Sequence, residues 1–263
     1  MPRLRTLPGT CLTGDWQMAI DGWLLEQRAP AFRLYRWQRP TLSLGFHQHH
    51  LEPHWGELAA AGLIELVRRP SGGRAVLHAG EITYALVWPD APRQRQRAYG
   101  LACGWLLDAF ASLGLPLEPG HQAASLQRSS CFASSTAADL VHAGGAKRIG
   151  SAQLWRQGCL LQHGSILVEP PAELWHQVFG TAPPPLPVLP LDAEALEALL
   201  HQCAAAALPT AAAGLVHQPL RAEEWNHIAA GRADYRVGES TPPCASPEAS
   251  IERTTWARAR PRG

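Results

Sequence analysis

The sequence predicts an α+β fold in a single domain. Segments with the two-residue alternation of strands are interleaved irregularly with segments of helical periodicity, and no internal repeat is present. The chain has 263 residues, of which 46% are hydrophobic and 17% are charged, a composition typical of globular proteins. We expect one structured domain over residues 1–231, followed by a disordered tail over residues 232–263 that is rich in Pro, Ser, Arg and Glu.

An amphipathic helix opens the chain. Apolar residues recur at helical spacing between Trp16 and Leu24, Thr13 and Asp15 can cap the helix, and Pro30 closes the segment. The further helices that we expect cover residues 54–61, 98–113, 172–179, 192–207 and 222–230. The strands that we expect cover residues 32–38, 42–46, 63–68, 74–77, 82–88, 139–142, 147–156 and 160–168.

Turn residues join several of these strands. The first two meet at a turn that contains Pro40, and the last three are joined by glycine turns at 144–145 and 157–158. Residues 118–138 show no periodicity and predict a long loop. Because long loops within a compact domain are usually functional or disordered, this segment is a candidate part of a site.

Composition excludes several classes of function. The 23 Lys and Arg residues against 22 Asp and Glu residues leave a net charge of +1, which gives no argument for a nucleic-acid partner. The six cysteines form no C-x-x-C pair, so we expect no metal site. We expect a cytoplasmic protein with reduced thiols and no membrane partner, because the chain shows neither a secretory signal nor a long apolar segment.

The stretch Arg68-Arg69-Pro70-Ser71-Gly72-Gly73-Arg74, which leads to His78, is the first candidate for a binding site. Paired glycines let a backbone approach a ligand closely, and arginine offers forked donors to a carboxylate or phosphate. A Gly-Gly turn between two strands can equally be a plain hairpin.

The second candidate comprises residues 145–153 and 161–167, where Lys147 and His163 lie on neighbouring strands. The alternative is that Lys147 is a surface charge and His163 a hydrogen-bonded residue of the sheet. Between the two candidates, Cys131 lies in a loop of small polar residues rather than in an apolar run. Most lone cysteines are inert, but a thiol near a lysine can have a lowered pKa and act as a nucleophile.

Together these stretches resemble the lipoate/biotin protein ligase and acyltransferase family. The resemblance includes the segments Met18-Ala19-Ile20-Asp21, Thr41-Leu42-Ser43-Leu44-Gly45, Arg-Arg-x-Ser-Gly-Gly-Arg-Ala-Val-Leu-His over 68–78, Glu81-Ile82-Thr83-Tyr84, Gly-Ser-Ala-Gln over 150–153 and Leu-Gln-His-Gly-Ser-Ile-Leu over 161–167. It covers roughly residues 12–180 and retains their order. The fold it implies is the mixed-sheet catalytic domain of that family.

The loop around Cys131 and Phe132 resembles the octanoyltransferase branch of the family, which works through an acyl-enzyme. The resemblance implies that Cys131 takes an octanoyl group from octanoyl-acyl carrier protein and yields it to a lysine of a lipoyl-accepting protein. Such acceptors are the glycine cleavage H protein and the lipoyl domains of dehydrogenases. Lys147 would stabilise the thiolate and polarise the acyl carbonyl. This scheme requires no cofactor.

The resemblance also implies a set of substrate-binding residues. They are Arg69, Ser71, Gly72, Gly73, Arg74, His78, Gly150, Ser151, Ala152, Gln153, His163 and Gly164. We further expect Leu77, Ile149 and Leu161 to contact the acyl chain.

Some features of the chain depart from the family pattern and leave other functions open. Small residues follow the cysteine loop where a proline and aromatic residues are usual, and His47, His49 and His50 form a cluster of no assigned role. One alternative is an ATP-dependent lipoate–protein ligase, in which Arg69 and Lys147 would contact an acyl-adenylate. Others are a non-catalytic acyl- or lipoyl-domain-binding protein and an enzyme that transfers octanoyl between carrier proteins. Biotin ligase is disfavoured because the chain lacks a Gly-Arg-Gly-Arg-x-Gly loop.

Overall fold

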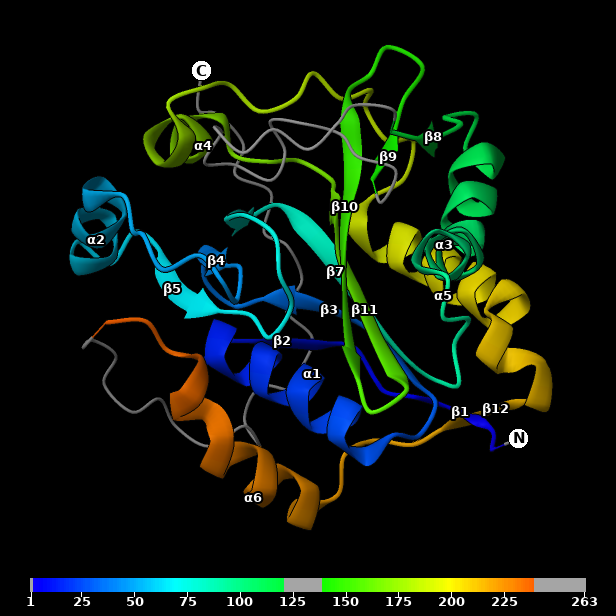
Figure 1. The fold of residues 1–263 in the computed structure, drawn as a ribbon. Coiled ribbons are helices and arrows are strands. Elements are labelled where there is room, and N and C mark those ends of the chain that lie inside the picture. The colour runs from blue at the N-terminus through cyan, green and yellow to red at the C-terminus, as the bar shows by residue number, and fades with distance from the viewer. Residues whose placement is uncertain (1, 121–138, 239–263) are drawn as a thin grey trace.

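A computed structural model describes residues 2–120 and 139–238 and contains two β-sheets (Figure 1). The main sheet has nine strands, in the order β12-β1-β3-β7-β11-β10-β9-β8 with β2 paired to β3. These strands are β1 (Leu4–Thr6), β2 (Thr10–Leu12), β3 (Ala31–Trp37), β7 (Glu81–Pro89), β8 (Glu118–Pro119), β9 (Leu140–Val141), β10 (Lys147–Arg156), β11 (Cys159–Leu167) and β12 (Leu215–His217). The smaller sheet has the order β5-β4-β6, with β4 (Thr41–Leu44), β5 (Glu65–Arg68) and β6 (Val76–His78).

Helices cover both faces of the main sheet (Figure 1). The sheet is mixed, with antiparallel pairing between β3, β7, β11 and β10 and parallel pairing between β1 and β3, which confirms the α+β class. The helices of the described ranges are α1 (Gly14–Gln27), α2 (Pro53–Ala60), α3 (Arg95–Ser112), α4 (Ala172–Phe179), α5 (Ala193–Ala207) and α6 (Ala222–Gly231), together with the 3-10 helices η2 (Pro209–Ala213) and η3 (Arg232–Tyr235). Helices α3 and α5 pack on one face. Helix α1, with α6 outside it, covers part of the other face, and the smaller sheet with α2 and α4 lies beside α1.

Strands β7, β11 and β10 form the antiparallel centre of the main sheet. Glycine turns connect β9 to β10 and β10 to β11, as predicted, and Gly145 and Gly158 have positive φ angles of 79° and 83°. Such angles are accessible to glycine at little cost, so the sequence determines both turns locally. Side chains on these strands alternate between the two faces. Ile149, Ile166 and Tyr84 consequently face α3, while Ala85 and Leu161 face α1.

Several strands pair with partners that the sequence analysis did not predict. The strands on either side of Pro40 belong to different sheets, because β3 pairs with β7 while β4 pairs with β5 and β6. The short strands β1, β2, β8 and β12 were not expected, and β8 lies at the start of the segment expected to be a long loop. Strand β1 pairs in parallel with β12 about 210 residues later in the chain. Local periodicity carries no information about such partners.

The first residues of the expected disordered tail, 232–238, belong to the described part of the chain. Residues 232–235 form η3, and both Arg232 and Arg236 pair with Asp15 of α1 at 2.8 Å. These ion pairs hold residues 232–236 against α1. Residues 239–263 of the expected tail lie outside the described residues. No helix in the described ranges is long and apolar enough to cross a membrane.

Candidate active site

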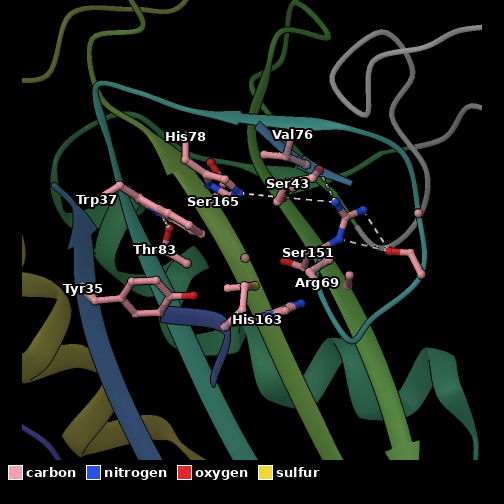
Figure 2. A pocket seen from close by; sticks show the side chains of 16 residues that line it. Tyr35, Trp37, Ser43, Arg69, Val76, His78, Thr83, Ser151, His163 and Ser165 are labelled. Carbon is pink, nitrogen blue, oxygen red and sulfur yellow. Dashed lines mark hydrogen bonds between the residues drawn. The ribbon is translucent and has the colours of Figure 1, made fainter. Parts of the chain in front are cut away.

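A cavity of about 70 Å³, partly open to solvent, lies between the smaller sheet and the face of the main sheet that α1 also covers (Figure 2). Nine of the predicted substrate-binding residues line it. They are Arg69, Gly72, Gly73, His78, Gly150, Ser151, Ala152, His163 and Gly164.

Small residues on the three central strands create the space. In the register of β7, β11 and β10, Thr83 lies opposite Ser165 and Ser165 opposite Gly150. Two residues further along β11, His163 lies between Ala85 and Ala152. Because residues two apart share a face, these two rows form one floor. The loop between β5 and β6, which carries the Gly72-Gly73 pair, covers that floor (Figure 2).

His163 joins three separate elements at one side of the cavity. Its Nε2 lies 2.5 Å from the Ser71 hydroxyl on the covering loop, and its Nδ1 lies 2.9 Å from Asp21 Oδ2 on α1. Both partners are fully buried. An imidazole that uses both ring nitrogens in this way is fixed in orientation, so His163 holds the loop and α1 in a defined position relative to β11.

Asp21 is the centre of a buried charge network. It accepts hydrogen bonds from Arg33 at 2.6 and 3.0 Å and from Tyr35 at 3.1 Å, in addition to its contact with His163. Burial alone would raise the pKa of Asp21, but the charge of Arg33 and the hydrogen bond from His163 outweigh burial and hold this pKa below its ordinary value. Burial, reinforced by the Asp21 charge, raises the pKa of Tyr35 well above its ordinary value. Asp21 therefore stays ionised and Tyr35 stays neutral at physiological pH.

A second imidazole, His78, is fixed in the same way on the opposite side. Its Nε2 lies 2.7 Å from the Ser43 hydroxyl, and its Nδ1 lies 2.6 Å from Glu81 Oε1. The ring stacks on Trp37 with centroids 3.9 Å apart, and the Trp37 indole donates to Thr83. The cavity is therefore bounded by two rigid hydroxyl–imidazole–carboxylate sets.

Arg69 organises the covering loop. Its guanidinium donates to the backbone carbonyls of Ser43, Gly72 and Arg74, at distances of 2.6–3.2 Å, and to the Ser43 hydroxyl at 3.2 Å. These contacts engage Nε and both terminal nitrogens of a group that has five N–H donors. Gly45 allows a close approach on the other side of the loop, because a Cβ there would lie 1.8 Å from the Gly73 oxygen. Arg69 thus lines the cavity and fixes the loop conformation.

The remaining predicted residues lie apart from the cavity walls. Ser71 lies behind His163, and the Gln153 amide donates to Gln162 at 2.8 Å. Arg74 belongs to the covering loop and contributes its carbonyl to Arg69. Lys147 is buried and pairs with Asp139 at 3.0 Å. Cys131, the predicted nucleophile, lies outside the described residues.

The three residues expected to contact the acyl chain lie elsewhere. Ile149 faces α3, Leu161 packs under α1, and Leu77 packs among residues of α2 and α4. Ile149 and Leu161 belong to the strands of the cavity, but side-chain alternation and position along the strand direct them into the core.

The structure adds seven lining residues that the sequence did not single out. They are Met18, Tyr35, Trp37, Ser43, Val76, Thr83 and Ser165. Most lie within or beside the quoted segments, but assigning them to the cavity requires knowing which strand face is covered. The pattern Tyr35-x-Trp37 was the clearest available signal, since both aromatic rings lie on one face of a predicted strand.

A polar network lies on the other side of the sheet from His163. The Tyr84 hydroxyl contacts Ser151 Oγ at 2.8 Å and accepts from the Gln162 amide at 2.9 Å. Gly164 lies beneath this contact, and a Cβ there would be 2.5 Å from the Tyr84 ring. Burial raises the pKa of Tyr84 well above its ordinary value, so its hydroxyl remains neutral.

The described residues contain no group of three or more His, Cys, Asp and Glu side chains that could hold a metal ion. His47, His49 and His50 are exposed at the end of β4. The walls of the cavity combine aromatic and aliphatic side chains with hydrogen-bonded polar groups. Such walls suit an apolar group that carries few polar atoms.

Comparisons with known proteins agree with this geometry. The model of the family "Lipoyl protein ligase A/B catalytic domain" matches residues 14–186, a range that contains every described lining residue of the cavity. The octanoyltransferase LipM of Oceanobacillus iheyensis is 36% identical over 177 residues, which are 62% of this chain and 63% of the relative. The octanoyltransferase LipM of Halalkalibacterium halodurans is 35% identical over 59% of this chain and 62% of the relative. The matched part thus spans less than two thirds of either relative.

Solved structures share the fold at low sequence identity. A bipartite lipoate protein ligase from Thermoplasma acidophilum superposes with a TM-score of 0.68 and 16% identity, over 89% of this chain and 93% of its own. A lipoate-protein ligase A bound with ATP superposes with a TM-score of 0.69 and 17% identity, over 89% and 95% of the two chains. At these identities the likeness establishes the fold alone.

Proposed function

The chain belongs to the family of lipoyl protein ligase A/B catalytic domains, and from this premise we propose that it is an octanoyltransferase of lipoate biosynthesis. The observation that carries the proposal is the identity of about 35% to octanoyltransferases named LipM, over about 60% of this chain. The proposed reaction transfers octanoyl from acyl carrier protein to a lysine of a lipoyl-accepting protein.

The cavity supports an acyl substrate. Its polar side chains are largely engaged with one another, and aromatic and aliphatic groups such as Tyr35, Trp37, Val76 and Met18 supply much of the wall. A hydrocarbon chain gains free energy when it leaves water for such a wall and demands no hydrogen bonds there. A fully polar or multiply charged substrate would find few free partners among the described side chains.

The chemistry proposed for Cys131 follows from the family resemblance. The thiolate of Cys131 attacks the thioester carbonyl of octanoyl-acyl carrier protein, a new C–S bond forms, and the carrier leaves as a thiolate that takes up a proton. The amine of the acceptor lysine then attacks the octanoyl-cysteine, an amide bond forms, the C–S bond breaks, and the proton lost by the amine balances the regenerated thiol. Neither step consumes a nucleotide, so the scheme needs no cofactor.

Lys147 is proposed to stabilise the Cys131 thiolate and the developing oxyanion. The buried ion pair of Lys147 with Asp139, at 3.0 Å, supports a fixed lysine rather than a mobile surface charge. The glycine cleavage H protein and the lipoyl domains of dehydrogenases are the proposed acceptors.

The contacts of Arg69 bear on the alternative of an ATP-dependent ligase. That alternative assigns Arg69 to an acyl-adenylate, whereas its guanidinium donates to three carbonyls of its own chain. A guanidinium committed to loop carbonyls has little capacity left for a phosphate. This observation favours the transferase.

Intact-mass spectrometry tests the proposal directly. The full chain is mixed with octanoyl-acyl carrier protein without nucleotide, and an adduct of one octanoyl group is expected on the wild type and absent from Cys131→Ser. Adding an H protein should discharge the adduct and modify the H protein. Modification that requires ATP and free acid, with release of AMP, would establish the ligase instead. Transfer that Cys131→Ser carries out at the wild-type rate would overturn the acyl-enzyme.

A further inference from the structure

Within the described part of the chain, one polar group of the cavity wall lacks a hydrogen-bond partner. Ser165 lies on β11 and is 3% exposed, and its Oγ has no partner among the described residues. The other polar side chains of the wall are all engaged. Ser43, Tyr35, Trp37, Arg69, His78, Thr83, Ser151 and His163 each have at least one partner. Among the described lining residues, Ser165 is therefore the one polar side chain without a hydrogen bond (Figure 2).

A buried hydroxyl without a partner is unfavourable, and native proteins retain few of them. The groups that do remain commonly meet a ligand or a bound water. Ser165 faces the cavity between Thr83 and Gly150. Because Gly150 has no side chain, the β10 side of Ser165 is not covered by a neighbouring group of the same row. The position of this hydroxyl points to a ligand atom that accepts a hydrogen bond.

We propose that Ser165 donates its O–H to the carbonyl oxygen of the bound acyl group. This inference rests on the proposed function, which supplies the acyl group, and it adds a substrate-contacting residue that the family resemblance did not assign. An acyl chain has one hydrogen-bond acceptor of this kind, and the cavity has one unpaired hydroxyl among its described residues. The two match in number and in chemistry.

The position of Ser165 also sets the direction in which the acyl group lies. Its cross-strand neighbour Gly150 is three residues from Lys147 along β10, so the carbonyl end lies toward that lysine. His163 lies two residues away on the same face of β11, about 7 Å along the strand. Met18 is one helical turn before Asp21, the partner of His163, so the hydrocarbon tail runs toward His163 and Met18.

Ser165 acts as a donor and not as a nucleophile. A serine nucleophile needs a base within hydrogen-bond reach, and no described base contacts Ser165 Oγ. The nitrogens of His163 contact Ser71 and Asp21, and those of His78 contact Ser43 and Glu81. A neutral donor that meets the carbonyl oxygen binds more strongly as negative charge develops there, so Ser165 stabilises the transition state of both acyl-transfer steps.

The test compares Ser165→Ala with Ser112→Ala in the full chain. Ser112 is a matched control because its hydroxyl donates to the Ala109 carbonyl on α3, away from the cavity. We expect Ser165→Ala to lower kcat/KM for octanoyl transfer about 10- to 100-fold. We expect its thermal unfolding temperature to stay level or rise, because the substitution removes an unsatisfied group. A merely structural serine would not separate activity from stability in this way.

A binding measurement keeps this inference separate from the proposed function. Octanamide offers the same carbonyl acceptor but cannot transfer its acyl group, and calorimetry measures its Kd without any turnover. We expect Ser165→Ala to weaken octanamide binding about 3- to 10-fold and Ser112→Ala to leave it unchanged. Binding by Ser165→Ala within twofold of the wild type would overturn the role of Ser165. A wild type that binds octanamide but transfers nothing would overturn the proposed function alone.

Discussion

Replacing Asp21 with asparagine removes a carboxylate that lies at the centre of the site. The Asp21 side chain is fully buried, and Arg33, its partner at 2.6 Å, is 1% exposed. Asparagine keeps the shape and an acceptor oxygen for Tyr35 or His163, but it cannot neutralise the guanidinium. The variant therefore leaves an uncompensated positive charge in the interior.

The cost of that charge can be worked from the burial of the pair. Breaking a buried ion pair by removing one partner costs about 3–5 kcal/mol, a large share of the roughly 5–15 kcal/mol that stabilises a typical domain. For a domain of this size, each kcal/mol of lost stability lowers the unfolding temperature by about 2–4 °C, so we expect a fall of roughly 6–20 °C. Arg33→Met should also destabilise the protein, because it strands the Asp21 carboxylate. The double variant removes both charges and should cost much less than the sum of the two single variants.

Urea unfolding followed by circular dichroism at pH 7 measures all four forms of this cycle. We expect an interaction free energy of at least about 2 kcal/mol between the two positions. The octanamide Kd should also rise in Asp21→Asn, because His163 loses its charged partner. Single-variant costs that add to within about 0.5 kcal/mol of the double-variant cost would refute the reasoning, since the two charges would then not depend on one another.

Three further predictions concern the covering loop and the C-terminal helix. Gly45→Ala should destabilise the protein by about 1–3 kcal/mol in thermal unfolding, because the new Cβ would lie 1.8 Å from a loop carbonyl oxygen. The control Gly56→Ala places its Cβ where nothing lies within 4 Å and should stabilise the protein by about 0.5–1 kcal/mol. Equal effects of the two substitutions would contradict the loop contact. Arg69→Lys should lower the free energy of unfolding by about 1–3 kcal/mol and raise KM for octanoyl transfer, because an ammonium cannot reach all the carbonyls of the loop. An unchanged KM would count against this role of Arg69. Hydrogen bonds from Arg5 lower the pKa of Glu224 to about 2. The Arg5–Glu224 pair should therefore stabilise the fold fully above the ordinary carboxyl pKa of 4.5 and lose this effect as the pH falls toward 2. Urea midpoints measured between pH 5 and 2 should fall more steeply with decreasing pH in the wild type than in Glu224→Gln.

Much of the fold was predictable because its signals are local. The glycines of the turns at 144–145 and 157–158 determine the β9-β10-β11 meander, and the apolar spacing of residues 16–24 determines α1. Sequence patterns could not show that β3 and β4 lie in different sheets or that β1 pairs with β12, since the partners of a strand are chosen by packing across the whole domain.

The candidate site was also predictable only in part, because its motifs are local and most of their hydrogen-bond partners are not. The Arg-Arg-x-Ser-Gly-Gly-Arg stretch and the segment around His163 were recognisable as ordered motifs, and nine of their residues line one cavity. Their partners were not recognisable. Asp21 lies 142 residues from His163, and Ser43 lies 35 residues from His78.

The sequence by itself determined the α+β class, the family and the segments that hold the site, because turn glycines, periodicity and ordered motifs act over short stretches of chain. Only the tertiary structure decided which side of each strand faces the cavity. Side chains alternate along a strand, so covering one face of β11 exposes Ser165 and His163 to the cavity and directs Ile166 and Gln162 to the other side. The same alternation places the hydroxyl of Ser165 in the cavity wall, where it has no hydrogen-bond partner among the residues that the structure describes.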